Sequence, residues 1–363
     1  MNLAGIQHLY NHDGPFVNLH IEVTRDSESA ARGMETRWTS IRHELSDASV
    51  DAALANRIGE LVREPTGVHG QARRSIVAAG SQVRFDDVRM GQGAWPEVTA
   101  VDPLPDVSGW VTQVDGEFPF TLVVADREGA EVDVYRSLSE QQHTHESVAG
   151  QTLHVHKVPS GDWSELQGHT EEVWRRNARA VADTVSAAAK EYGGKLVLLA
   201  GEVRARAEVR EALDSGGNLD VVEIESGGRA AGSSSEALWN EVHTAVGQQW
   251  AQDRQQVRER LDEQSGQDRA VARGLRNVLE ALVRGQVERL VVDLTKAHEQ
   301  TIAPGDYPGI VLPASAFEGR RLPADQALVA AGAATDADLS VLPIDSIGGD
   351  GIAALLRWEA DGS

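Results

Sequence analysis

The spacing of hydrophobic and polar positions predicts a strand followed by two helices at the start of the chain. Residues 16–23 (FVNLHIEV) alternate apolar and polar side chains, which is typical of a half-buried strand. Residues 27–63 then carry two apolar stripes at helical spacing. Further short strands are predicted at residues 75–79 and before Pro103. We therefore expect an α/β domain over residues 1–115.

A different order of elements is predicted for residues 116–225. Residues 118–136 (FPFTLVVADREGAEVDVYR) have the pattern of a β-hairpin, with Gly129 at the end of its turn. A long helix ends at Gly193-Gly194, and the buried strand Lys195–Ala200 follows. That helix has one continuous apolar stripe, formed by Trp174, Ala178, Val181, Val185, Ala188 and Tyr192. The order predicts a mixed sheet with helices packed on it.

An exposed polar loop at residues 160–169 (SGDWSELQGH) is predicted between a β-type run, Thr152–Val158, and the long helix. One interpretation is local, because Ser164 and Gln167 match the S-x-x-Q capping box of a helix start and Trp163 would pack beside it. The other is functional, because an exposed indole and carboxamide can stack on RNA bases and hydrogen-bond to them. Composition alone favours neither interpretation.

The last part of the chain begins with a Gly/Ser-rich linker at residues 226–236 (SGGRAAGSSSE). Helices are predicted through about residue 284, with an interruption near Ser265-Gly266. Strands are predicted at Val287–Leu294, Ile310–Leu312, Ser340–Ile344 and Ile352–Trp358. This pattern predicts a small α/β/α sandwich over residues 226–363, and hence an α/β protein of three consecutive domains.

Composition limits the classes of function. The 363 residues include no cysteine, no run long and apolar enough to span a membrane, and no export signal at the N-terminus, so we expect a cytoplasmic protein. The formal net charge of −22 opposes autonomous binding to DNA or RNA. Residues 254–289 are an exception, with eight arginines against six acidic residues. The excess of arginine has two alternative explanations. It can reflect a GC-rich genome, or it can serve bidentate contacts with phosphate groups.

Candidate chemistry is sparse. His143-x-His145 and His154-x-His156 could each chelate a metal from one face of a strand, which leaves a metal-binding module as one hypothesis. No acidic residue lies at fitting spacing on the same strand, so we predict neither a metal nor a cofactor. The chain also lacks a phosphate-binding glycine loop and a G-x-S-x-G nucleophile elbow. We therefore predict no catalytic residue.

The order of the three parts resembles the archaeal and eukaryotic peptide-chain release factors and Pelota. It is more similar to their bacterial relatives, the Balon-type ribosome hibernation factors, and among these to the mycobacterial branch. The resemblance covers nearly the whole chain and rests on the order and spacing of residues 16–45, 161–213 and 274–294, with the late stretch 345–358. It implies a release-factor-like or Pelota-like fold whose third domain is of a ribosomal-protein type.

In release factors the tip of the middle domain carries Gly-Gly-Gln, which promotes hydrolysis of peptidyl-tRNA. This chain has no Gly-Gly-Gln, since its four Gly-Gly pairs precede Lys195, Asn218, Arg229 and Asp350. At the matching tip it departs from the GGWSQ-like string of bacterial relatives at Asp162 and Glu165. The resemblance therefore implies a plug without catalysis, with the peptidyl-transferase side contacted by Gly161, Asp162, Trp163, Ser164, Glu165, Gln167 and His169.

The resemblance also implies partners and a function. The protein is expected to bind the vacant A site of the 70S ribosome, to contact rRNA of both subunits, and to block translation under stress or dormancy. Elongation factor Tu is an expected partner, whereas membranes and DNA are not. The alternative is a rescue-type peptidyl-tRNA hydrolase that acts through the loop 160–169. On the decoding-centre side, the candidate contacts form a small basic loop: His69, Gly70, Gln71, Arg73 and Arg74.

Overall fold

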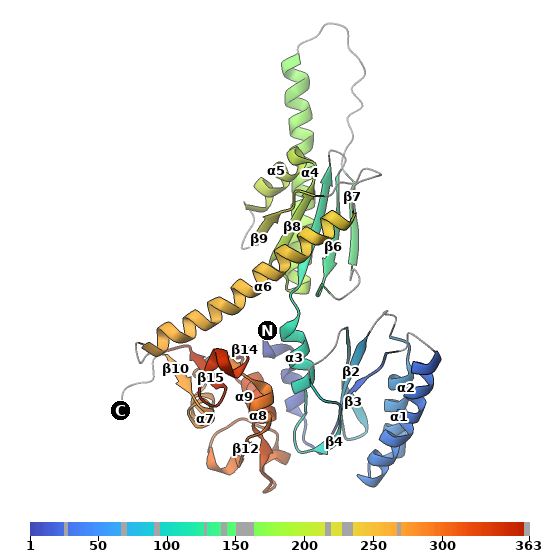
Figure 1. The fold of residues 1–363 in the computed structure, drawn as a ribbon, viewed down its shortest axis with the longest axis vertical. Coiled ribbons are helices and arrows are strands. Elements are labelled where there is room, and N and C mark those ends of the chain that lie inside the picture. Colours follow the sequence, from blue (N-terminus) through green and yellow to red (C-terminus); the bar gives the residue numbers. More distant parts are fainter. Residues whose placement is uncertain are drawn as a thin grey trace. The chain divides into compact units, whose positions relative to one another are not determined.

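The chain folds into two compact units (Figure 1). Unit 1 consists of Met1–Gly116 and Arg254–Ser363, and unit 2 of Glu117–Asp253. The computed structural model describes residues 1–24, 28–66, 71–90, 95–126, 129–138, 144–149, 163–214, 219–226, 235–266 and 270–358. The division into three domains at 115/116 and 225/226 remains a prediction, and its first boundary lies one residue from the boundary between the units.

Unit 1 begins with an antiparallel sheet of order β3-β2-β1-β4. Its strands are β1 (Phe16–Glu22), β2 (Ala72–Ala79), β3 (Gln82–Met90) and β4 (Val98–Asp102). Two helices, α1 (Glu28–Asp47) and α2 (Ala52–Arg63), cover one face, as the apolar stripes predict. Val17, Leu19 and Ile21 of β1 point into this interface and are almost fully buried.

The prediction that β1 is half-buried is wrong, because both of its faces are covered. Asn18 is 0% exposed and His20 is 3% exposed, although both are polar. Asn18 donates from Nδ2 to the Leu104 carbonyl at 3.0 Å, and His20 Nδ1 lies 2.8 Å from Ser75 Oγ. These hydrogen bonds offset the loss of hydration that burial causes. A strand with polar residues on one face can therefore be buried on both.

A second sheet of unit 1 has the order β10-β15-β11-β14. Only the β11–β14 pair is parallel. Its strands are β10 (Val271–Arg273), β15 (Ile352–Leu356), β11 (Val287–Val292) and β14 (Asp338–Val341). One face packs on α7 (Leu275–Val283) and α9 (Ala324–Ala334), and the other on α10 (Ile344–Ile347) and on Val257 and Leu261 of α6 (Ser235–Gly266). This is the predicted α/β/α layering, and the mixed α/β class is confirmed.

Two details of this part differ from the sequence prediction. Residues Ile310–Leu312 form no strand, because they lie in a long connection between the two-residue strands β12 (Thr301–Ile302) and β13 (Leu322–Pro323). The sequence pattern also gave no bounds for helix α9, because its sequence ADQALVAAGAA is apolar nearly all round. A helix buried on every side lacks the amphipathic stripe by which helices are recognised.

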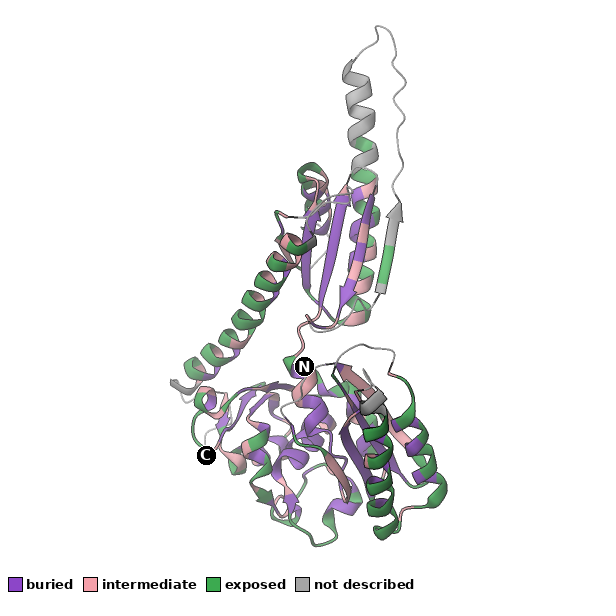
Figure 2. Ribbon diagram, turned by 45° about the vertical axis from the view of Figure 1, so that its right-hand side comes forward, coloured by how far each residue is buried: buried purple, intermediate pink, exposed green. Residues whose placement is uncertain are grey.

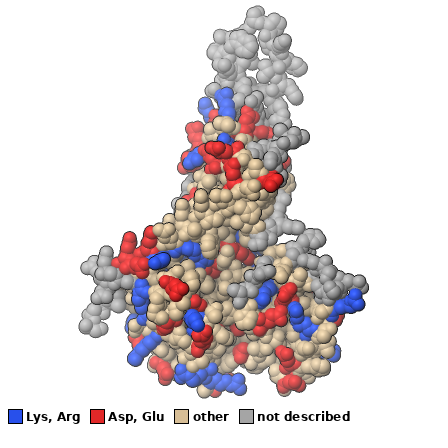
Figure 3. All heavy atoms as spheres, viewed as in Figure 1, with Lys and Arg blue, Asp and Glu red and all other residues tan. Residues whose placement is uncertain are grey.

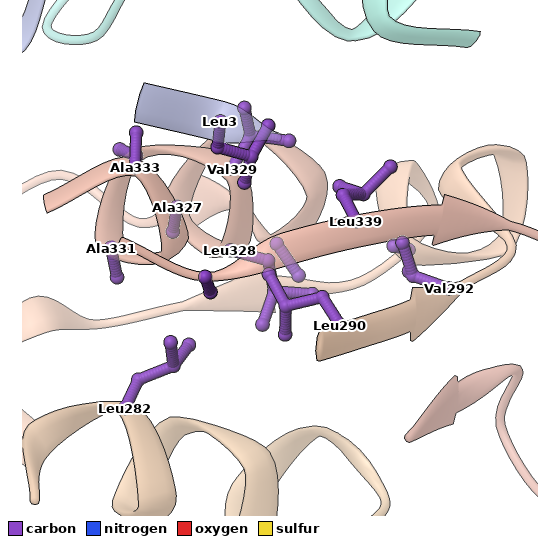
Figure 4. Packing of buried hydrophobic residues seen from close by; sticks show 14 of the residues in the cluster. Leu3, Leu282, Leu290, Val292, Ala327, Leu328, Val329, Ala331, Ala333 and Leu339 are labelled. Atoms are coloured by element: carbon purple, nitrogen blue, oxygen red, sulfur yellow. The ribbon is translucent and has the colours of Figure 1, made fainter. Parts of the chain in front are cut away.

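One core joins the two sheets of unit 1. The N-terminal 3₁₀ helix η1 (Leu3–Asn11) inserts Leu3 beside Val329 of α9 and near Leu290 of β11 (Figure 4). The same core includes Phe16 of β1. Each Å² of apolar surface that is buried contributes about 25 cal/mol to stability. Because residues of both sheets share this core, the two sheets stabilise each other. Figure 2 shows the buried strands against the exposed outer faces of the helices.

Unit 2 contains a five-stranded sheet of order β7-β6-β5-β8-β9. Its strands are β5 (Phe120–Asp126), β6 (Gly129–Tyr135), β7 (Thr144–Ala149), β8 (Leu196–Gly201) and β9 (Asp220–Glu223). The predicted hairpin β5–β6 is confirmed, and β8 and β9 run parallel to β5. Helices α4 (Trp163–Tyr192) and α5 (Val203–Asp214) cover one face.

The first half of α6 covers the other face of this sheet. Trp239, Val242 and Val246 pack there against Phe120 and Tyr135. The sequence pattern assigns this helix to the third domain because it follows the Gly/Ser-rich stretch. Its apolar residues nevertheless complete the core of unit 2, which the sheet and two helices alone leave uncovered on one side.

Candidate functional site

The long helix α4 presents the segment that the sequence predicts as functional. Its anchor is the predicted apolar stripe, in which Ala178, Val181 and Val185 are buried against the sheet of unit 2. The 30 residues of α4 span about 45 Å at 1.5 Å per residue. The contacts of this stripe with the sheet begin at Ala178, in the middle of the helix.

The predicted loop 160–169 is shorter than expected. Helix α4 begins at Trp163, so Ser164, Glu165, Gln167 and His169 lie in its first two turns and not in a loop. No proline interrupts residues 163–169, and Gly168 alone does not end a helix. Gly161 and Asp162, the side chains of the other five candidates, and the predicted strand Thr152–Val158 lie outside the described residues. The contacts predicted for this tip therefore stay predictions.

The predicted basic loop of unit 1 is partly strand. Arg73 and Arg74 lie in β2, while His69 and Gly70 lie outside the described residues. Gln71 is exposed, and Arg73 donates from Nη1 to the Trp95 carbonyl at 2.7 Å. Gln71 is therefore accessible to a partner, whereas the guanidinium of Arg73 is partly engaged within the fold.

Arg74 is a structural residue. Its side chain is 6% exposed and pairs with Asp86, with Nε 2.6 Å from Oδ1 and Nη2 2.6 Å from Oδ2. Nη2 also lies 3.1 Å from Glu64 Oε2. Because the guanidinium is held by this bidentate pair inside the fold, Arg74 has no free donor face for RNA. The surface role predicted for it is corrected accordingly, and Gln71 and Arg73 remain candidates.

Six of the seven described arginines in the stretch 254–289 have an acidic partner. Acidic and basic side chains are interspersed over the face shown in Figure 3. Arg269 lies outside the described residues, and the other seven arginines each have a partner: Arg254 with Asp115, Arg258 and Arg273 with Asp262, Arg260 with Glu288, Arg276 with Glu280, Arg284 with Gln286, and Arg289 with Asp338. The largely buried pairs of Arg254 and Arg289 serve the fold, whereas Arg258 and Arg276 remain exposed in their pairs.

Of the four predicted metal candidates, only His145 falls among the described residues. Its Nδ1 lies 2.7 Å from Asp133 Oδ1, directly across the β6–β7 pair. This hydrogen bond raises the pKa of His145. Among the residues that the structure describes, no group of three or more His, Asp or Glu side chains is arranged to hold a metal ion. No helix in the described ranges is long and apolar enough to cross a membrane.

A buried polar cluster of unit 1 escaped sequence reasoning. Ser108 Oγ donates to Asp325 Oδ2 at 2.7 Å, and His298 Nδ1 lies 3.2 Å from both carboxylate oxygens. Asp325 is 0% exposed, and Asp106 nearby has its pKa raised to about 6 by burial and by the charge of Asp325. The serine donates to the carboxylate and not to the imidazole, so the three residues do not form a Ser-His-Asp triad. The cluster joins α3 (Ser108–Gly116) to α9 and α8 (Leu294–His298).

Comparison with solved structures shows low overall similarity. The Dom34 protein of S. cerevisiae, a translation termination-like factor, shares 12% identity, with 80% of this chain and 81% of that chain covered and a TM-score of 0.43. An archaeal Pelota, from a model of its ribosome-bound complex with ABCE1, shares 16% identity over 99% of this chain and 95% of that chain, with a TM-score of 0.41.

Comparison with known sequences is more informative. Two proteins of Mycobacterium tuberculosis, from strains H37Rv and CDC 1551, are 26% identical over 96% of this chain and 94% of their own length, and both are uncharacterised. Residues 119–267, which include α4 and the whole sheet of unit 2, match the model of bacterial archaeo-eukaryotic release factor family 2. The predicted resemblance to bacterial relatives of the archaeal and eukaryotic release factors is thereby confirmed.

Proposed function

We propose that this protein is a ribosome hibernation factor, which binds the vacant A site and blocks translation without hydrolysing peptidyl-tRNA. The observation that carries the proposal is the family match over residues 119–267 in a chain that contains no Gly-Gly-Gln. The match relates unit 2 to release factors, and the missing motif removes the groups that position a hydrolytic water in them.

The chemistry of the tip supports a plug. In the sequence, Asp162 directly precedes α4 and Glu165 is the third residue of the helix, and a helix macrodipole favours acidic residues at such positions. Carboxylates repel the phosphates of rRNA, so the tip would occupy space and would not grip the backbone. Trp163 adds a large apolar surface on which a base can stack.

Because the net charge is −22, the proposal includes a carrier protein that brings this protein to the ribosome. Long-range repulsion from rRNA lowers the rate of unaided association. A protein carrier such as elongation factor Tu would offset this cost by bringing the protein to the A site. Cytoplasmic localisation follows from this site of action.

Sedimentation of ribosomes tests the proposal. Lysates of stationary-phase and growing cells are separated on sucrose gradients at low and moderate salt, and the protein is detected in each fraction. We expect it with 70S particles, and more so in stationary phase. Recovery only from ribosome-free fractions at both salt concentrations would refute the proposal.

A release assay tests the absence of catalysis. Ribosomes carrying labelled peptidyl-tRNA and an empty A site are incubated with the protein or with a Gly-Gly-Gln release factor as positive control. We expect no release above background and a loss of access for the control factor. Release by the wild-type protein, abolished in Gln167→Ala, would instead establish the rescue hydrolase.

A further inference from the structure

Four polar side chains of unit 1, here called the polar chain, form a continuous series of contacts: Asp106, Ser108, Asp325 and His298. The Ser108 amide donates to Asp106 Oδ1 at 3.1 Å, and the Ser108 hydroxyl donates to Asp325 Oδ2 at 2.7 Å. On the other side of Asp325, His298 Nδ1 lies 3.2 Å from both carboxylate oxygens. The polar chain therefore links the start of α3 to α9 and to the last residue of α8.

The polar chain runs from the interior of unit 1 to its surface. Ser108 and Asp325 are 0% exposed and Asp106 is 8% exposed. The His298 side chain, by contrast, is 47% exposed. Asp106 is also fixed through its amide, which donates to Asn18 Oδ1 at 3.0 Å. Solvent therefore reaches this series of groups at its His298 end, whereas the two carboxylates are held inside.

Acidic groups outnumber basic groups within the polar chain. Among the described residues, no lysine or arginine pairs with Asp106 or Asp325, so the imidazole of His298 is the one basic group beside two carboxylates. The other titratable or charged groups that act on the polar chain are Tyr10 of η1, Asp102 of β4 and, through Asp102, Arg320. The net charge of this buried site is smallest when His298 and Asp106 both hold a proton, because the imidazolium then balances Asp325.

The surroundings shift the pKa values of Asp106 and His298 in the same direction. Burial and the charge of Asp325 raise the pKa of Asp106 to about 6. The hydrogen bond to Asp325 raises the pKa of His298 above its ordinary value of 6.5. Tyr10 stays neutral, because burial raises its pKa as well. A raised pKa in the folded state favours the folded contacts while the proton is held, and this contribution is lost as the pH rises through the folded pKa.

Helix α8 is the short element at the solvent end of the polar chain. It has five residues, of which Leu294 and Ala297 are buried. Besides the polar chain, the Ala324 amide of α9 donates to the Gln300 carbonyl, just after α8, at 2.9 Å. Helices this short are marginal without tertiary contacts, and elements with few buried side chains open locally. Loss of the polar contact is therefore expected to release α8 before the strands of the core.

We propose that the polar chain is a pH-operated latch, which fastens α8 to α9 in acid and releases it as the pH rises. In acid, protonated Asp106 is neutral and the His298 imidazolium balances the Asp325 carboxylate. At higher pH, Asp106 and His298 each lose one proton to solvent, and the three groups change from no net charge to two negative charges. The repulsion between the buried carboxylates is relieved when the end of α8 moves away and water enters. The latch goes beyond the proposed function and does not depend on it.

Hydrogen exchange of the whole chain between pH 5 and pH 8, corrected for the intrinsic effect of pH on exchange, tests the latch. Amides of α8 are compared with those of β11 in the core of the same unit. We expect the protection of α8 to fall about 10-fold or more over this range, since one pKa unit corresponds to a factor of ten. At pH 8 it should lie well below the protection of β11. Equal protection of α8 and β11 at pH 8 would overturn the latch, because α8 would then open only with the whole unit.

Two substitutions in the polar chain should change the exchange profile at opposite ends of the pH range. Asp106→Asn keeps the acceptor for the Ser108 amide but cannot ionise, so α8 should stay protected at pH 8. His298→Gln keeps a donor but cannot become charged, so the protection of α8 should fall at pH 5 and match the wild type at pH 8. The matched controls Asp336→Asn and His8→Gln, at exposed positions of unit 1, should keep the wild-type profile. A wild-type profile in Asp106→Asn would place the pH dependence outside the polar chain and would overturn the proposal.

Discussion

Arg254 Nη1 lies 2.6 Å from Asp115 Oδ2, and this ion pair of unit 1 is largely buried, with 15% and 5% of the two side chains exposed. Asp115 also accepts hydrogen bonds from the Met1 amino group at 3.2 Å and from the Val341 amide at 2.7 Å. Arg254 donates in addition to the Val341 carbonyl at 2.7 Å. The carboxylate thus connects α3, α6, β14 and the N-terminus in one network.

Removal of one partner from this network should destabilise the protein strongly. Arg254→Met leaves the Asp115 charge buried beside fewer donors, which is expected to cost about 3–5 kcal/mol of unfolding free energy. Urea denaturation measures the change. The control Arg276→Met, at an 83% exposed position, should change the free energy by less than about 0.5 kcal/mol. Equal effects of the two substitutions would contradict a structural role for the pair.

Gly332 of α9 tests how tightly the shared core of unit 1 is packed. A Cβ at this position would lie 2.7 Å from Leu290 Cδ1 and 3.0 Å from Leu3 Cδ1. Gly332→Ala is therefore expected to destabilise by about 1–3 kcal/mol through overpacking. Gly247→Ala, in the exposed interior of α6 with no atom within 4 Å, should instead stabilise by up to about 1 kcal/mol. Thermal unfolding of both variants gives the comparison.

Asp106 should make the protein less stable as the pH rises. Burial and the charge of Asp325 raise its pKa from 3.8 to about 6 in the folded state, so between these values the folded state binds more protons than the unfolded state. Asp106→Asn is expected to gain about 1–3 kcal/mol at pH 8 and nothing at pH 3.5. Urea midpoints across this range report the difference. A pH-independent effect would show that Asp106 is not the titrating group.

His20 should act in the opposite direction. Burial, with the charge of Arg73, lowers its pKa from 6.5 to about 4, so the unfolded state binds the extra proton within this window. The stability contribution of neutral His20 is present above pH 6.5 and is lost as the pH falls towards 4. Relative to His20→Gln, the wild type should lose about 1–3 kcal/mol between pH 7 and pH 4.5. Histidine NMR titration gives the midpoint directly.

Substitutions of the two neighbouring arginines of β2, Arg73 and Arg74, are expected to affect ribosome binding and stability differently. Arg74→Gln breaks the buried pair with Asp86 and is expected to cost about 3–5 kcal/mol. Arg73→Gln loses one hydrogen bond to a carbonyl and should cost about 1 kcal/mol. If Arg73 contacts rRNA as predicted, its variant binds ribosomes more weakly and with a smaller dependence on salt. Unchanged binding at all salt concentrations would remove Arg73 from the decoding-centre contacts.

Local spacing was sufficient to predict most elements and the class of fold. The stripe that includes Ala178, Val181 and Val185 predicts α4, because one helical face must be apolar to pack on a sheet. The chain order of strands and helices likewise predicts a mixed sheet for residues 116–225. Absence of the Gly-Gly-Gln motif is also a property of the sequence alone.

Tertiary structure decided which side chains remain available to partners. Arg74 and Arg254 look like surface cations in the sequence, but each is held by an acidic residue of another element, Asp86 of β3 for Arg74 and Asp115 of α3 for Arg254. The same holds for Asn18 and His20, whose burial depends on a second layer that local spacing does not encode. Periodicity records which face of an element is apolar. Charge pairing and exposure depend on contacts between different elements, and only the folded chain brings these together.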